Sequence, residues 1–108
     1  MSEFRGIVLY NIEHDGGLNG VYTNNHIINS EMCTETAKRR NPRQEIDDNL
    51  RIYNCFYFDV DDVQQNCILT LRIENEIYNA EWNVDGRIIF RGQGFQMNNN
   101  QIAISYWR

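Results

Sequence analysis

Apolar side chains recur at every second position through the last third of the chain, residues 68–107, and turn-forming residues interrupt them at short intervals. Just before and within this segment, Cys67, Leu69, Leu71 and Ile73 alternate strictly with the residues between them. A period of two is typical of a β-strand, because successive side chains point to opposite faces of a sheet. The pattern predicts consecutive short strands and therefore a β domain.

The first half of the chain carries weaker versions of the same pattern. Residues 4–12 and 18–23 are predicted to form a hairpin, because His14-Asp15-Gly16-Gly17 between them supplies the glycines that a tight turn needs. Residues 27–37 fit a strand or a helix, and their Asn, Ser and Thr content favours a strand. Residues 38–49, with Pro42, are expected to form the longest loop. Residues 50–60 are apolar on both faces, as in a central strand or a barrel wall.

The turn at Asp85-Gly86 sets the register of the hairpin around it. We expect a three-residue loop over residues 84–86, which pairs Trp82 with Ile88, because a two-residue loop would mix a glutamate with the core face. Downstream, the parity of the apolar residues changes, and Phe95 is expected on the core face. One extra residue must then be absorbed, and the glycines of residues 92–94 are the predicted place for this β-bulge.

Seven or eight short strands with tight turns predict a small antiparallel up-and-down β-barrel, since closure removes exposed sheet edges. An open β-sandwich is the alternative. The 108 residues form one domain, 1–108, because no Pro/Gly/Ser-rich linker divides them. Five Phe, six Tyr and two Trp provide bulky groups for a core.

Three segments resemble the avidins, the biotin-binding members of the calycin group. They are Gly17-Leu18-Asn19-Gly20-Val21-Tyr22-Thr23, Phe90-Arg91-Gly92-Gln93-Gly94-Phe95 and the aromatic closing residues 102–108, in the same order as in that family. The resemblance implies a small barrel with a ligand site at its open end. It carries Tyr22 over as a ligand residue, followed by Thr23, and Trp82 lies in a segment similar to the strand with a ligand-stacking Trp. At Arg5-Gly6-Ile7-Val8 the avidin residues that hold biotin are not retained.

Two groups of residues are candidates for binding. If the sheet closes, inward-pointing aromatic and polar side chains either line a cup at the barrel mouth or fill a solid core, and in a barrel this small we expect a mostly filled interior. The candidate ligand residues are Tyr22, Thr23, Tyr78, Trp82 and Phe90. A run of basic residues is either a partner-docking loop or a solvated loop beside acidic neighbours. This run contains Lys38, Arg39, Arg40 and Arg43.

Composition excludes several classes of function. A net charge of −5 argues against nucleic-acid binding, which needs an excess of Lys and Arg. No long apolar run or signal-like start is present, so we expect a soluble, cytoplasmic protein with no membrane association. Cys33, Cys55 and Cys67 are odd in number and form no CxxC pair, which indicates buried reduced thiols.

The sequence predicts no metal, cofactor or catalytic motif. His14 and His26 belong to no metal-binding pattern, and the carboxylates of Asp59, Asp61 and Asp62 lack the spacing of a calcium loop. We therefore expect a non-enzymatic binding domain that engages a small molecule or a protein at the barrel mouth or the outer loops. The alternative is an interaction module of the inhibitor or immunity type with a solid core. An enzyme is the third hypothesis, and the sequence gives no oligomeric state.

Overall fold

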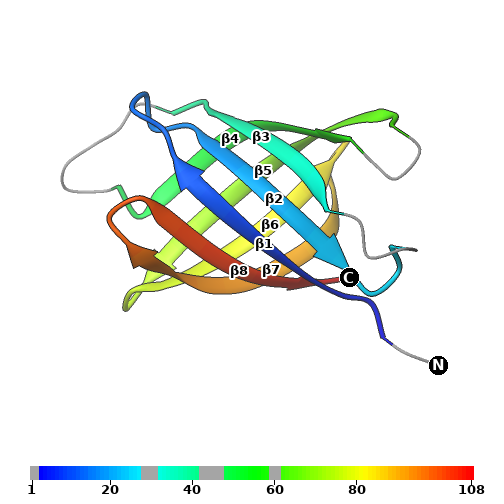
Figure 1. Cartoon of the computed structure of the whole chain (residues 1–108). Coiled ribbons are helices and arrows are strands. Elements are labelled where there is room, and N and C mark those ends of the chain that lie inside the picture. The colour runs from blue at the N-terminus through cyan, green and yellow to red at the C-terminus, as the bar shows by residue number, and fades with distance from the viewer. Residues whose placement is uncertain (1–2, 28–31, 42–47, 59–61) are drawn as a thin grey trace.

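The structure is a computed structural model that describes residues 3–27, 32–41, 48–58 and 62–108. Each strand pairs antiparallel with the next along the chain, and the last pairs with the first, so the sheet is a closed up-and-down barrel (Figure 1). The strands are β1 (Arg5–Ile12), β2 (Leu18–Asn24), β3 (Cys33–Arg39), β4 (Leu50–Phe58), β5 (Gln64–Glu74), β6 (Ile77–Val84), β7 (Arg87–Asn98) and β8 (Gln101–Trp107). The barrel prediction is confirmed.

The barrel closes through continuous pairing of β1 with β8. The register runs from Arg5 opposite Trp107 to Asn11 opposite Gln101. This pairing satisfies backbone groups that would otherwise lie on two open sheet edges.

No helix in the described ranges has the length and hydropathy needed to cross a membrane.

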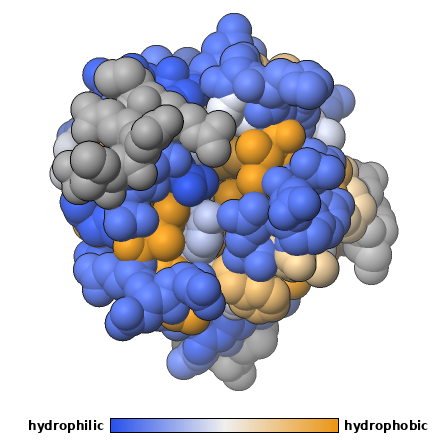
Figure 2. Space-filling model, turned by 90° about the vertical axis from the view of Figure 1, so that its left-hand side faces the viewer, coloured by the Kyte–Doolittle hydropathy of each residue, from blue (hydrophilic) through white to orange (hydrophobic). Residues whose placement is uncertain are grey.

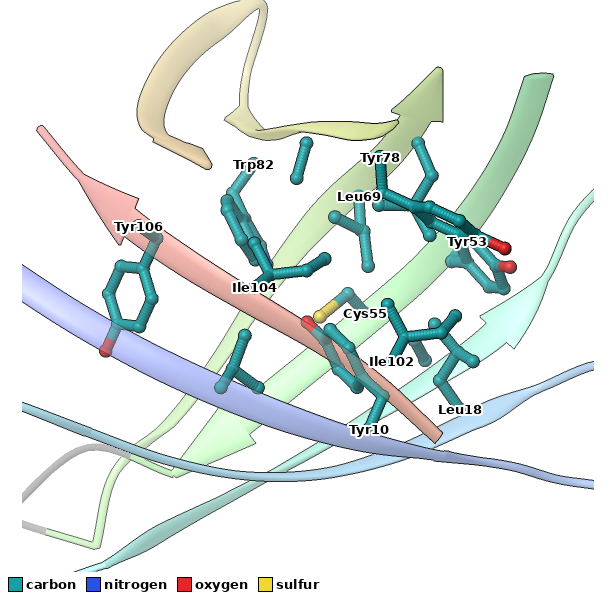
Figure 3. Packing of buried hydrophobic residues seen from close by; sticks show 14 of the residues in the cluster. Tyr10, Leu18, Tyr53, Cys55, Leu69, Tyr78, Trp82, Ile102, Ile104 and Tyr106 are labelled. Atoms are coloured by element: carbon teal, nitrogen blue, oxygen red, sulfur yellow. The ribbon is translucent and has the colours of Figure 1, made fainter. Parts of the chain in front are cut away.

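The two ends of the barrel differ. The chain termini lie at one end, together with the β2–β3, β4–β5 and β6–β7 connections, and the other four connections lie at the opposite end (Figure 1). Figure 3 shows that inward-pointing side chains, including Leu18, Tyr53, Tyr78 and Ile102, pack closely together, while Tyr106 stands apart from this group. The interior is therefore solid toward the end opposite the termini.

An ionic cluster covers the solid end. The Arg39 guanidinium, whose side chain is only 9% exposed, pairs with the Asp48 carboxylate, and Arg51 lies 3.5 Å from the other Asp48 oxygen. Arg51 also lies 5.5 Å from the ring centroid of Tyr78. From this end, hydrophobic residues are visible between hydrophilic ones (Figure 2).

The predicted register of the β6–β7 hairpin is wrong. Asp85 and Gly86 form a two-residue turn, with φ of 51° and 80°, and Asn83 pairs with Ile88. Two positive φ values give the primed turn whose twist matches a right-twisted hairpin, which is why the short loop wins over the three-residue loop. Ile89 is the extra residue of a bulge, which returns Trp82 to a position opposite Phe90.

The predicted bulge at residues 92–94 is also wrong. These residues pair without interruption with both β6 and β8, and the β7–β8 irregularity falls at Met97. Phe95 points outward and is 55% exposed. Gly94 takes the inward position because a Cβ there would collide with the Ala103 carbonyl oxygen. The backbone of β8 lies too close to Gly94 for any side chain at this position.

The ambiguous segment is a strand where it is described. In β3 the buried face carries Cys33, Glu35 and Ala37, while residues 28–31 lie outside the described ranges. Lys38 and Arg39 belong to β3, so the loop predicted to begin at Lys38 starts later. Of the predicted strand 50–60 the structure describes residues up to 58, all in β4.

Candidate functional site

A cavity of about 320 Å³ opens at the barrel end that holds the termini. Its walls come from the starts of β1, β3, β5 and β7 and from the ends of β2, β4, β6 and β8. The lining residues are Phe4, Val8, Tyr22, Asn24, His26, Ile27, Cys33, Glu35, Tyr57, Gln65, Trp82, Phe90, Tyr106 and Arg108. Most of this surface is aromatic or aliphatic, with few polar groups.

Among the residues that the structure describes, Glu35 is the buried acid of the cavity. Its side chain points into the barrel and is 7% exposed. Tyr10 on β1 donates a hydrogen bond to Glu35 Oε2 on β3, two strands away. The strand between them contributes Gly20, which pairs with Tyr10 on one side and with Glu35 on the other. A Cβ at Gly20 would lie 2.7 Å from Tyr10 Cδ1, so only glycine lets the ring cross β2.

Tyr106 repeats this arrangement at the mouth. Gly6 pairs with Tyr106 on β8 and with Asn24 on β2, and a Cβ at Gly6 would lie 2.1 Å from the Tyr106 ring. The Tyr106 ring therefore crosses β1. Its hydroxyl donates to the Thr23 carbonyl oxygen and accepts from Asn24 Nδ2, both at 3.2 Å. Two glycines thus place two tyrosine hydroxyls inside the barrel.

The surroundings of Glu35 disfavour its charge. Burial raises the pKa of its carboxyl above the ordinary value, while the hydrogen bond from Tyr10 and the neighbouring Cys55 and Trp82 act in the opposite direction. Burial, together with Glu35, also raises the pKa of Tyr10 well above 10.0. The phenol is consequently the donor of the pair.

Aromatic side chains form a continuous wall above Glu35. The Trp82 and Tyr106 ring centroids are 5.6 Å apart, and Phe90 packs edge to face against both. On the facing side, Tyr22 contacts Tyr57 at 6.0 Å, and its hydroxyl donates to the Phe58 carbonyl oxygen at 2.8 Å. Burial raises the pKa of Tyr106 to about 12 and that of Tyr22 further. These hydroxyls remain neutral at physiological pH.

Two basic side chains lie at the rim. The Arg108 guanidinium is 4.6 Å from the ring centroid of Phe4 and 5.8 Å from that of Phe90. His26 packs edge to face against Phe4 at 4.9 Å. The aromatic rings of the mouth therefore already hold one cation against their faces.

The three cysteines are free and buried. Cys33 lines the cavity. Cys55 on β4 lies directly opposite Cys67 on β5 in the register of the two strands. A hydrogen bond with Cys67, burial and the nearby Glu35 all raise the pKa of the Cys55 thiol. Within the described ranges no three His, Cys, Asp or Glu side chains are arranged to hold a metal ion.

The structure brings together three of the five candidate ligand residues. Tyr22, Trp82 and Phe90 line the cavity. Tyr78 lies elsewhere in the barrel, with its hydroxyl donating to Gln96 Oε1 at 2.9 Å. Thr23 is not among the lining residues, and its backbone carbonyl holds Tyr106.

The three basic residues of this run that the structure describes do not form one surface. Lys38 and Arg40 are exposed, whereas Arg39 is turned toward Asp48 in the ionic cluster. Arg43 lies outside the described residues, as do Asp59 and Asp61.

Sequence reasoning missed Glu35, because it lies in the segment whose period was ambiguous. The alternation of Cys33, Glu35 and Ala37 was the available signal for an inward-facing acid. Tyr106 was also missed as a cavity residue, although it lies two positions from Ile104 on the apolar face of the closing strand.

Comparison of the chain with protein-family models, with curated proteins and with solved structures gave no match.

Proposed function

We propose that this protein is a non-enzymatic binding domain that takes a small, largely apolar molecule into the cavity at the mouth of the barrel. The observation that carries this proposal is the aromatic wall of Trp82, Phe90 and Tyr106 above the buried carboxyl of Glu35. Small-molecule sites are typically concave and mostly apolar, with a few fixed polar groups, and begin at about 300 Å³. The cavity of about 320 Å³ fits the lower part of that range.

The polar groups of the cavity are held in fixed positions. Tyr106 is anchored by Asn24, Tyr22 by the Phe58 carbonyl, and Glu35 by Tyr10. Fixed polar groups orient a ligand without a reorganisation cost on binding. This preorganisation supports a binding role.

The non-enzymatic part of the proposal rests on the titratable groups. The pKa values of the Cys55 thiol and of the Tyr10 and Tyr22 hydroxyls are all raised. A thiol or phenol that acts as a nucleophile needs the opposite shift, toward its ionised form. These groups are therefore suited to packing and hydrogen bonding.

The resemblance to avidins supports a mode of binding in which the ligand enters through the open end of the barrel. Tyr22 and Trp82, the residues that the resemblance carries over, both line the cavity. We propose that the ligand enters this chain from the open end of the barrel, as the calycin resemblance implies. The chemical identity of the ligand depends on Glu35 and the aromatic wall rather than on a biotin site.

A protein-interaction module is the second candidate, favoured by the outer wall. Phe95, Ala103, Leu9 and Val21 lie in one lateral row across β7, β8, β1 and β2. Phe95 is 55% and Val21 41% exposed. Exposed apolar side chains in one row are typical of a contact surface for another protein.

Native mass spectrometry of the protein purified from its source cells tests the first candidate. We expect a small-molecule adduct on the native protein and its loss from a Cys33→Trp variant, in which the larger side chain fills the cavity. A Lys38→Trp variant, altered on the exposed outer face of β3, is the matched control and should keep the adduct. A protein-sized partner without a small adduct would support the second candidate instead.

A further inference from the structure

We propose that the ligand of this cavity is a small arylalkyl or alkyl amine, bound with its ammonium group against Glu35 and its apolar body against the aromatic wall. This inference rests on the proposed small-molecule function and adds the chemical class of the ligand. Two independent observations carry it: the charge environment of Glu35 and the composition of the walls.

The first observation is that Glu35 has no cationic partner within the described ranges. The ion pairs there join arginines to Glu3, Asp48 and Glu81, and none reaches Glu35. Buried acids are normally paired with a cation, because an isolated charge is costly in a low-dielectric interior. The Tyr10 hydroxyl supplies one hydrogen bond but no charge. A ligand ammonium group would supply a positive charge beside this carboxyl and so favour its ionised form.

The second observation is that aromatic rings surround the space above Glu35. Tyr22, Tyr57, Trp82, Phe90 and Tyr106 line the same cavity. The negative face of an aromatic ring attracts a cation within about 6 Å of its centroid, and this attraction strengthens when water is excluded. The Arg108 guanidinium on Phe4 and Phe90 shows this attraction at the rim.

The depth of Glu35 limits the shape of the amine. Along β3, Glu35 lies two residues beyond Cys33 toward the barrel interior, and two residues of a strand span ~7 Å. An ammonium group at Glu35 then leaves room toward the mouth for a short linker and a single ring. The cavity of about 320 Å³ agrees with a ligand of this size.

The test uses matched probes that differ only in their head group. Benzyl, 2-phenylethyl and 3-phenylpropyl compounds are compared as the amine, the alcohol and the carboxylate. Binding is measured by calorimetry and by fluorescence in a Trp107→Phe background, where Trp82 is the remaining tryptophan. At one chain length or more, we expect the amine to bind at least about tenfold more tightly than the alcohol, with the carboxylate weakest.

Glu35→Gln removes the charge and keeps the shape of the side chain. Its expected effect is a loss of amine affinity of about tenfold or more, with the affinity for the alcohol changed by less than about threefold. Glu35→Met provides a second variant without a charge, should the glutamine leave the fold unstable. Glu81→Gln, which removes an acid from the outer wall, is the matched control and should leave every affinity unchanged.

The outcomes separate the two proposals. If the alcohol or the carboxylate binds the native protein as tightly as the amine, or if Glu35→Gln binds the amine unchanged, the amine class is overturned while small-molecule binding stands. If none of the probes binds up to its solubility limit, the amine class is overturned, and the adduct in native mass spectrometry decides separately whether small-molecule binding stands.

Discussion

The Tyr10 hydroxyl reaches Glu35 by passing over the glycine that separates their strands. Tyr10, Gly20 and Glu35 occupy one lateral row of the sheet, with the tyrosine ring lying above the backbone of β2. Glu35 lines the cavity and Tyr10 belongs to the packed core, so this row joins the packed half of the interior to the hollow half. Its three residues should therefore depend on one another energetically.

Tyr10→Phe removes the donor to Glu35 and leaves a buried carboxyl oxygen without this partner. We expect the free energy of unfolding, measured with urea, to fall by about 1–3 kcal/mol. In a double-mutant cycle with Glu35→Met, the two losses should not add, because either change breaks the same contact. Additive losses would show that the pair is not coupled.

Gly20→Ala places a methyl group where the Tyr10 ring lies. A Cβ there would be 2.7 Å from Tyr10 Cδ1, so the ring must move. We expect a loss of about 1–3 kcal/mol in the free energy of unfolding, as for other overpacked cores. Asn19→Ala, on the exposed face of the same strand, is the control and should change stability little. Equal effects at positions 19 and 20 would contradict the crossing geometry.

Stability should depend on pH through Glu35. Since burial raises the pKa of Glu35 in the folded state above its ordinary value of 4.5, the folded protein holds this proton to higher pH than the unfolded chain does. Its contribution is fully present below that ordinary value and is lost as pH rises through the raised folded pKa. The pKa values of the facing Tyr10 and Cys55 are also raised, so these groups stay protonated over pH 4–8.

Urea unfolding of the native protein and of Glu35→Gln between about pH 4 and pH 8 tests this dependence. The stability of the native protein relative to Glu35→Gln should fall as pH rises. A difference that stays constant, or that grows with pH, would show that the carboxyl pKa is not raised by folding.

Trp82→Ala should be among the more damaging changes in the barrel. Trp82 is 4% exposed and packs against Phe90 and Tyr106. Truncation of a buried aromatic side chain costs about 3–5 kcal/mol. Thermal unfolding and urea titration measure this loss. A variant of native stability that has lost ligand binding would instead place Trp82 in the site alone.

Asp48→Asn should destabilise the solid end of the barrel. The substitution leaves the guanidinium groups of Arg39 and Arg51 close together without their carboxylate. Because both side chains are largely buried, we expect a loss of about 2 kcal/mol, in the range for hydrogen bonds to charged groups. Glu81→Gln is the control, since its partners Arg72 and Arg91 are more than half exposed and such pairs contribute about 0–1 kcal/mol.

The strand order and the closure of the barrel could be predicted because most strands carry an alternating pattern and short turns separate them. Register could not be predicted as well. At Asp85 and Gly86 the twist of a primed turn decided the loop length, and a bulge at Ile89 then corrected the pairing. The shorter loop and the bulge together leave the alternation of apolar residues unchanged. This alternation alone therefore locates neither of them.

Part of the cavity could be predicted, because aromatic residues such as Tyr22, Trp82 and Phe90 lie in predicted strands and were candidates for the inward face. Glu35 was missed, because a single acid between threonines on an ambiguous strand resembles a surface residue, and only its alternation with Cys33 and Ala37 indicates the inward face. Arg39 is the opposite case, a residue that was expected at the surface and is largely buried. Its position in a basic run suggests exposure, yet its partner Asp48 lies nine residues away across a loop. Contacts of this kind depend on the folded geometry.

The position of Phe4 and Arg108 at the cavity mouth bears on how the protein can be handled. Because β1 enters and β8 leaves the barrel at the same end, a purification tag or a fused domain at either terminus would emerge beside the ligand entrance. Such an extension would compete with the ligand for the aromatic rim. Insertions at the β5–β6 turn, on the far side of the solid half, would leave the entrance clear.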